Sequence, residues 1–529
     1  MNKIVNPVLP GYHPDPSMLR VGDDYYIAVS TFEWFPGVPI YHSKDMINWR
    51  LLTYPLTRES QLNMIGNINS GGVWAPCLSY SGGTFYLIFT DVKSRKGAFK
   101  DTHNYLVTAE NIEGPWSDPI YLNSSGFDPS LFHEEDGTKW LLNMIWDHRK
   151  GTNSFAGIAL QEYSVEKKKL VGPVKNIFKG SSLGLTEAPH IYKHNGYYYL
   201  ITAEGGTWYT HALTMARSKS LFGPYEIDPT NPVLTSNQND TSQLQKAGHG
   251  SLVETQNGEW YMAHLCARPV IDKKCILGRE TAIQKCYWTE DDWLRIEGGP
   301  HPQMEVEAPN LSLHPFEQES NFDDFSGTSL KKYWNSLRRT FTEDWISLSE
   351  RPGYLRLKGG ESMQSTHHQS LLARRLEGFS IEAETTVEFS PEHFQQMAGL
   401  IVYYDTDDYV YLRITDHEQH GKCIGIIESK YGNYDELLDE DIPLTFPSTI
   451  LKAKIENEYL QFSFSDGEGG IRKIGPKIDV SHLSDDDADY IRFTGTFCGV
   501  CVQDLSGQAI PADFKCFSYK ETENIQHHR

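Results

Sequence analysis

The chain has 529 residues, a net charge of −22 and 39% hydrophobic residues. This length is too great for a single hydrophobic core, so two or more domains are expected. The acidic balance argues against nucleic acids and anionic membrane surfaces as partners, because both are negatively charged, and no apolar run approaches the ~20 residues that span a bilayer.

The N-terminal segment, residues 1–7, has no apolar stretch of the kind found in secretion signals. Only two of the eight cysteines, Cys498 and Cys501, form a CxxC pair, and the apolar residues around them predict a β-strand. Buried core thiols are therefore favoured over a metal site. Together these features predict a reducing, cytoplasmic environment.

A loop motif returns five times in the first half of the chain, about sixty residues apart. The copies begin His13-Pro14-Asp15-Pro16-Ser17, Trp74-Ala75-Pro76-Cys77, Phe127-Asp128-Pro129-Ser130, Glu187-Ala188-Pro189-His190 and Gly248-His249-Gly250-Ser251. An apolar stretch, a turn and an aromatic-rich strand follow each copy. Repeats of this length, made of strands and hairpin turns, predict a five-bladed β-propeller over residues 1–300.

The pattern changes after the repeats. A proline-rich stretch over residues 301–320 predicts an ordered linker. Beyond it the sixty-residue period is lost, and short alternating strands such as 354–358 and 409–414 are separated by glycine and acidic turns. This pattern predicts a β-sandwich over residues 321–529, and hence an all-β protein.

Three carboxylates, Asp15, Asp128 and Glu187, lie at nearly equivalent points of three repeats, although Glu187 is one residue earlier when the motifs are aligned on the following proline. Residues that begin the innermost strands of a propeller surround one mouth of its channel, so these side chains are expected to converge. Such a pocket suits hydrolysis of a glycosidic bond, in which one carboxyl group protonates the leaving oxygen and an ionised one activates water.

Taken singly, these residues also have ordinary structural explanations. An aspartate before a proline is a common turn former, because its side chain bonds nearby backbone groups. His249 lies between two glycines, and this setting favours a substrate contact or a structural hydrogen-bond donor over a metal ligand. The common repeat phase of the three acids is what favours catalysis.

These motifs resemble those of β-xylosidases of glycoside hydrolase family 43, in the subgroup with a C-terminal β-sandwich. The resemblance covers essentially the whole chain and includes Leu277-Gly278-Arg279-Glu280-Thr281 and Phe322-Asp323-Asp324-Phe325. It implies a five-bladed propeller followed by a concanavalin-like sandwich. It also implies exo-acting, inverting release of D-xylose from the non-reducing ends of 1,4-β-xylo-oligosaccharides such as xylobiose.

The resemblance further implies a role for each site residue. Asp15 would be the general base and Glu187 the general acid, while Asp128 would tune the pKa of Glu187 and orient the sugar. The remaining residues would bind the substrate, and they are Arg279, Trp74, Phe32, Thr207, His249 and, from the second domain, Phe497. No cofactor is implied, although some relatives hold a divalent cation such as calcium in the channel beside the histidine that matches His249.

The resemblance also implies a homo-oligomer, either a dimer or a tetramer. Three alternatives to the β-xylosidase function remain. The chain could be mainly an α-L-arabinofuranosidase, because the two glycosides present similar hydroxyl layouts. A fructan hydrolase also pairs a five-bladed propeller with a sandwich, but it has an Asn-Asp-Pro context where this chain has His13-Pro14-Asp15. A non-catalytic sugar-binding protein would not need a proton donor opposite a base.

Overall fold

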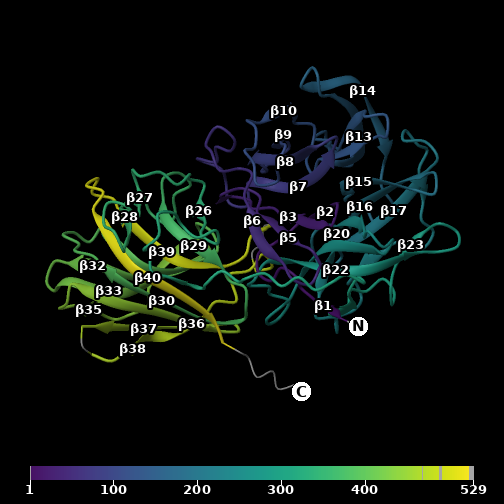
Figure 1. Cartoon of the computed structure of the whole chain (residues 1–529). Helices are drawn as coiled ribbons and strands as arrows, with labels where there is room; N and C mark the ends of the chain where they lie inside the picture. The colour runs from purple at the N-terminus through teal and green to yellow at the C-terminus, as the bar shows by residue number, and fades with distance from the viewer. Residues whose placement is uncertain (1, 468, 488–490, 523–529) are drawn as a thin grey trace. The chain divides into compact units, whose positions relative to one another are not determined.

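The computed structural model describes residues 2–467, 469–487 and 491–522, which form strands, turns and loops (Figure 1). Two compact units are present. The first comprises Met1–Asn63, Gly71–Arg268 and Arg279–Glu317, and the second comprises Met64–Ser70, Pro269–Gly278 and Gln318–Arg529. Within the described residues, no helix has the length and hydropathy required to cross a membrane.

The first unit contains five antiparallel sheets, each built from strands that lie close together in the chain (Figure 1). The strands of the first three sheets are β2 (Ser17–Val21), β3 (Asp24–Ala28), β5 (Ile40–Ser43) and β6 (Arg50–Thr53); β7 (Gly72–Ser81), β8 (Thr84–Ser94), β9 (Asp101–Ala109) and β10 (Ile120–Asn123); and β11 (Ser130–His133), β12 (Lys139–Trp146), β13 (Phe155–Ser164) and β14 (Lys169–Phe178). Each sheet is associated with one copy of the loop motif, which precedes its first strand or lies within it.

The last two sheets have the same plan. Their strands are β15 (Glu187–His194), β16 (Tyr197–Glu204), β17 (Ala212–Ser218), β18 (Glu226–Ile227) and β19 (Leu234–Thr235), and then β20 (Gln245–Glu254), β21 (Trp260–Ala267), β22 (Arg279–Trp288) and β23 (Leu294–Ile296). The short strand β4 (Trp34–Phe35) follows β3, and β1 (Lys3–Val5) pairs with β24 (Glu305–Glu307).

Contacts between neighbouring sheets close a ring. Strand β2 contacts β7, β7 contacts β11, β11 contacts β15, and β20 contacts both β16 and β2. Apolar side chains fill the seams; Met18 and Tyr25 of the first sheet, for example, share a buried cluster with Val253 and Tyr261 of the fifth. The predicted five-bladed β-propeller is confirmed.

The second unit is the predicted β-sandwich (Figure 1, green to yellow). One sheet contains β25 (Phe322–Asp323), β27 (Ile346–Ser347), β28 (Leu355–Lys358), β30 (Ser380–Glu388), β36 (Ser448–Glu456), β37 (Tyr459–Asp466), β38 (Arg472–Asp479) and β40 (Pro511–Glu521). The other contains β29 (Ser370–Arg375), β31 (Gln396–Tyr403), β32 (Tyr409–His417), β33 (Gly421–Lys430), β34 (Asn433–Glu436), β35 (Ile442–Pro443) and β39 (Phe497–Asp504). Strand β26 (Ser336–Leu337) lies between β25 and β27 in the chain. Alternating apolar residues such as Leu400 and Leu451 fill one continuous core.

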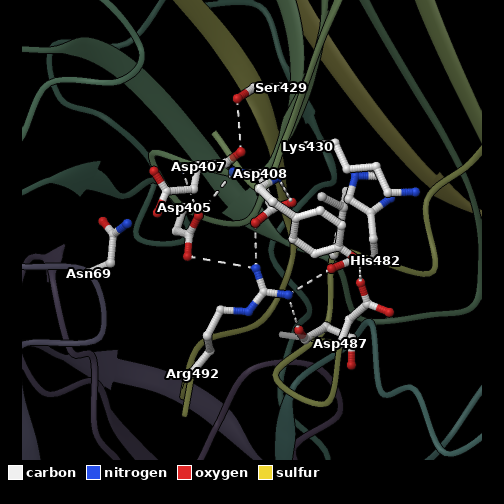
Figure 2. Close-up of polar contacts among 12 residues, drawn as sticks. Asn69, Asp405, Asp407, Asp408, Ser429, Lys430, His482, Asp487 and Arg492 are labelled. Carbon is white, nitrogen blue, oxygen red and sulfur yellow. Dashed lines mark hydrogen bonds and ion pairs between the residues drawn. The ribbon is translucent and has the colours of Figure 1, made fainter. Parts of the chain in front are cut away.

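The second unit also contains a buried ionic network (Figure 2). Arg492 donates to Oδ2 of Asp408 at 2.6 Å and to the carbonyl oxygen of His482 at 2.9 Å. Oδ2 of Asp405 lies 3.9 Å from the same guanidinium group. Arg492 and both carboxylates are fully buried. Their contacts join the β31–β32 turn to the loop that precedes β39.

The segment Pro269–Gly278 connects β21 to β22 of the propeller, yet it belongs to the second unit. Ile276 and Leu277 are buried in the sandwich core. The N–H of Cys275 donates to Oγ of Ser484 at 2.9 Å, and the carbonyl oxygen of Ile276 accepts from the N–H of Thr496 at 3.1 Å. The chain then passes directly into the first residue of β22, Arg279.

Candidate active site

The five loop motifs share a backbone kink. One residue of each copy has a left-handed φ, and these residues are Asp15 (56°), Ala75 (36°), Asp128 (55°), Ala188 (49°) and His249 (44°). Each such non-glycine residue costs about 1–3 kcal/mol and persists only where surrounding contacts impose it. The kink therefore recurs at or near the start of the innermost strand of every blade.

The kink also explains the offset of Glu187. Asp15 and Asp128 occupy the kinked position itself, whereas Trp74 and Glu187 precede it by one residue. The strands that contain these earlier residues have bulges, between Trp74 and Cys77 in β7 and between Glu187 and His190 in β15. A bulge inserts an extra residue and redirects a side chain, so the one-residue difference is accommodated within the repeat.

Asp15 is held by three neighbours. Oγ of Ser30 donates to Oδ2 of Asp15 at 2.6 Å, and Nη1 of Arg279 donates to Oδ1 at 3.1 Å. Nδ1 of His249 lies 3.7 Å from the same Oδ1 atom. Because the Asp15 side chain is only 6% exposed, this ion pair and hydrogen bond replace the water that a carboxylate would otherwise require.

Asp128 and Glu187 form a second, proton-holding part of the site. Burial, and then the charge of Asp15, raise the pKa of Asp128 to about 8, against the lowering effect of Arg279. Burial, and then the charges of Asp128 and Asp15, raise the pKa of Glu187 well above its usual range. Both raised pKa values favour the protonated forms of Asp128 and Glu187 near neutral pH.

Arg279 links the carboxylates to the aromatic residues. Its Nη1 atom also donates to Oγ1 of Thr207 at 3.3 Å, and its guanidinium carbon lies 5.2 Å from the centre of the Phe32 ring. The ring of Phe32 contacts that of Trp74 at 5.8 Å, and Trp74 meets Phe127 edge-on at 5.5 Å. The structure thus brings together the propeller residues selected from the sequence.

His249 is buried, and burial lowers its pKa, as it does for His190 and His211, whose pKa values fall to about 3. These rings are therefore neutral near pH 7. In the part of the chain that the structure describes, no group of three or more His, Cys, Asp and Glu side chains is arranged to hold a metal ion. A channel cation beside His249 stays a prediction.

Phe497 is the first residue of β39, where it pairs with Arg375 on one side and Tyr403 on the other. It is fully buried, and the guanidinium carbon of Arg375 lies 5.5 Å from its ring centre. All of these contacts are within the second unit. Its assignment as a wall of the sugar pocket stays a prediction.

Ser30 is a site residue that the sequence did not reveal. Besides donating to Asp15, its hydroxyl oxygen accepts the N–H of Ala75 at 2.8 Å and so connects the first and second blades. A serine two residues beyond a strand has no distinguishing pattern. Only the kink at Ala75, which turns that N–H toward the first blade, gives it this role.

Comparison with known proteins follows the same division of the chain. The model of "Glycosyl hydrolases family 43" matches residues 4–294, and that of the "Beta xylosidase C-terminal Concanavalin A-like domain" matches residues 322–520. The crystal structure of a xylan β-1,4-xylosidase from Bacillus halodurans is 64% identical, with a TM-score of 0.97 over 98% of this chain and 100% of that one.

Two further relatives are similar over nearly their whole length. A β-xylosidase of Bacillus subtilis is 50% identical over 98% of this chain and 100% of its own. A xylosidase/arabinosidase of Humicola insolens is 47% identical over 99% of both chains. Both matches therefore span the propeller and the sandwich of this chain.

Proposed function

Because the chain belongs to glycosyl hydrolase family 43, we propose that it is an exo-acting, inverting β-xylosidase that releases D-xylose from the non-reducing ends of 1,4-β-xylo-oligosaccharides. The observation that carries this proposal is the asymmetry of the site. Asp15 is paired with Arg279, whereas burial and neighbouring carboxylates raise the pKa of Glu187. An inverting hydrolase needs this combination of an ionised base and a protonated acid.

Each carboxyl group then has a separate task. Asp15 removes a proton from water as the water attacks the anomeric carbon, and Glu187 delivers a proton to the departing glycosidic oxygen. Burial raises the pKa of Glu187, and Asp128, which titrates together with Glu187, raises it further when its carboxyl group is ionised. Arg279, always charged, orients the base and presents further donors to a sugar hydroxyl.

The direct test is proton NMR of xylobiose from the first minute of the reaction. Direct displacement by water predicts that α-xylose appears first. If β-xylose appears first, a covalent intermediate is formed and one of the carboxylates is a nucleophile. If xylobiose is bound and left intact, the protein is a sugar-binding protein.

Substitutions separate the two catalytic roles. Glu187→Gln should lose most activity on xylobiose and much less on 4-nitrophenyl β-D-xyloside, because the nitrophenolate leaving group needs little protonation. Asp15→Asn should lose activity on both substrates, since both require activated water. Near wild-type turnover by Asp15→Asn would remove it as the base.

Activity on α-L-arabinofuranosides is the second candidate, and the name of the Humicola insolens relative favours it. We propose it as a side activity. The ratio of kcat/KM on the 4-nitrophenyl derivatives of the two sugars measures it, and a ratio that favours the arabinoside would make this the principal activity.

Three further proposals concern the setting of the enzyme. Buried free thiols such as Cys498 and Cys501 suit a reducing cytoplasm, and cell fractionation would test that location. A homo-oligomer is proposed from the resemblance, and sedimentation velocity would show whether the protein is a monomer. No cofactor is required by acid–base chemistry of this kind.

A further inference from the structure

Glu204, the last residue of β16, is a fully buried carboxylate outside the acid–base group. Its Oε1 atom accepts the N–H of Ser181 at 2.8 Å and the hydroxyl of Thr186 at 2.7 Å. Its Oε2 atom accepts the hydroxyl of Ser181. All three donors are neutral groups of the short segment that enters β15.

This arrangement folds the entering segment around the carboxylate. Gly180 has a left-handed φ of 90°, and a Cβ atom there would lie 2.0 Å from Oγ1 of Thr186 and 3.1 Å from Oε1 of Glu204. The N–H of Gly205 also donates to the carbonyl oxygen of Gly184 at 2.9 Å. A buried carboxylate is tolerable only where donors are held in place around it, so the segment from Gly180 to Thr186 has little freedom to move.

The held segment ends at Thr186, one residue before Glu187. Within the sheet, Glu187 pairs with Ala203, but the ladder is irregular between Glu187 and His190. Regular strand pairing therefore does not by itself fix the backbone of Glu187. The hydrogen bond between Glu204 and Thr186 instead holds the residue that directly precedes Glu187.

We propose that Glu204 is a positioning residue for the general acid: through Thr186 and Ser181 it holds the backbone from which Glu187 reaches the glycosidic oxygen. This proposal rests on the proposed function. Its basis is geometric, because the groups whose charges raise the pKa of Glu187 are Asp128 and Asp15 and do not include Glu204.

Four substitutions test it, with kcat measured on xylobiose and on 4-nitrophenyl β-D-xyloside. We call the hydrogen bonds of Glu204 with Thr186 and Ser181 the clamp, and Glu204→Leu and Thr186→Val each disrupt it. We expect kcat on xylobiose to fall ~10- to 100-fold, the scale expected for a misplaced catalytic group. The fall in kcat on the aryl xyloside should be much smaller. Glu204→Gln keeps an oxygen for the two donors at Oε1, and Thr186→Ser keeps the hydroxyl, so both should remain near wild type.

Thr202→Val is the matched control, because it removes a buried hydroxyl whose hydrogen bond, within the residues that the structure describes, is to Oγ1 of Thr214 at 2.8 Å in the same blade and not to Glu204, Thr186 or Ser181. It should affect both substrates equally and slightly. Should Glu204→Leu not fold, as judged by its melting curve, Thr186→Val carries the test. Equal losses on the two substrates in Glu204→Leu and Thr186→Val would overturn the proposal, as would loss of activity in Glu204→Gln.

Glu187→Gln is the reference for the size of the leaving-group effect. If Glu187→Gln is selective for the aryl xyloside and the clamp variants are not, only the role of Glu204 is overturned. If Glu187→Gln itself shows no such selectivity, the acid assignment and the inference drawn from it both fail.

Discussion

Replacing Ser30 by alanine isolates the support of the general base. The hydroxyl donates to Asp15 at 2.6 Å and accepts the N–H of Ala75 at 2.8 Å. Alanine removes both hydrogen bonds and leaves the side-chain volume almost unchanged. The carboxylate then keeps its ion pair with Arg279 but loses its link to the second blade.

The expected size of the effect follows from the charge of the acceptor. A hydrogen bond to a charged group contributes about 1.5–3 kcal/mol, and about 1.4 kcal/mol of transition-state stabilisation corresponds to a tenfold change in rate. Ser30→Ala should therefore lower kcat/KM ~10- to 100-fold. Because the base acts on water, the loss should be the same for xylobiose and for 4-nitrophenyl β-D-xyloside.

Initial rates on the two substrates, with thermal unfolding of each variant, provide the assay. Ser17→Ala is a suitable control, since Oγ of Ser17 accepts the N–H of Leu78 at 2.9 Å between the same two blades and donates to no carboxylate in the structure described. Ser17→Ala should lose about 1 kcal/mol of stability and Ser30→Ala more, because it also loses a hydrogen bond to a charged group, whereas only Ser30→Ala should lose most of its activity.

Equal activities of the two serine variants would refute the reasoning, because the contact with Asp15 would then contribute nothing to catalysis. A loss confined to xylobiose would also refute it. That pattern belongs to the acid, which protonates the leaving group, and not to the base.

Four other measurements follow from the structure. The basic limb of the pH profile on xylobiose should lie above the pKa of about 4.3 of an ordinary glutamate, because the pKa of Glu187 is raised. Asp128→Asn should move this limb to lower pH, and an unmoved limb would contradict the effect of Asp128 on the pKa of Glu187. Burial raises the pKa of Asp405 to about 7, so stability should fall as the pH rises from about 4 through 7. Asp405→Asn should reduce this decrease in the free energy of unfolding, by about 4 kcal/mol at most. Urea titrations at about pH 4 and pH 7 would measure it. Dialysis against a chelator should leave kcat unchanged; a loss of activity that calcium restored would instead show that the enzyme requires a divalent cation. Phe497→Ala should raise KM for xylobiose in a folded protein, and unchanged kinetics would remove Phe497 from the pocket.

The propeller was predictable because its repeats are long and each contains a turn and an aromatic strand. The convergence of Asp15, Asp128 and Glu187 followed from that symmetry alone. The offset of Glu187 by one residue could be seen in the sequence, but its cause could not. It depends on left-handed residues such as Ala188 and on bulges, which are set by contacts between blades.

Ser30 and Glu204 lay beyond sequence reasoning for a different reason. Neither belongs to a repeated motif, and each acts through a partner that is distant in the chain or on another strand. Oγ of Ser30 bonds Ala75, 45 residues away, and Glu204 bonds Ser181, 23 residues away. Such roles are created by folding, so a serine or glutamate of this kind is indistinguishable in sequence from many others.

The assignment of Pro269–Gly278 to the sandwich unit has a consequence for protein engineering. Residues that complete the sandwich core, Ile276 and Leu277, come from between two propeller strands. A chimaera that exchanges the second unit between relatives would require five junctions, at 63/64, 70/71, 268/269, 278/279 and 317/318. A single cut after residue 317 would give a propeller fragment with an apolar loop immediately before Arg279, and such a fragment should aggregate rather than hydrolyse xylosides.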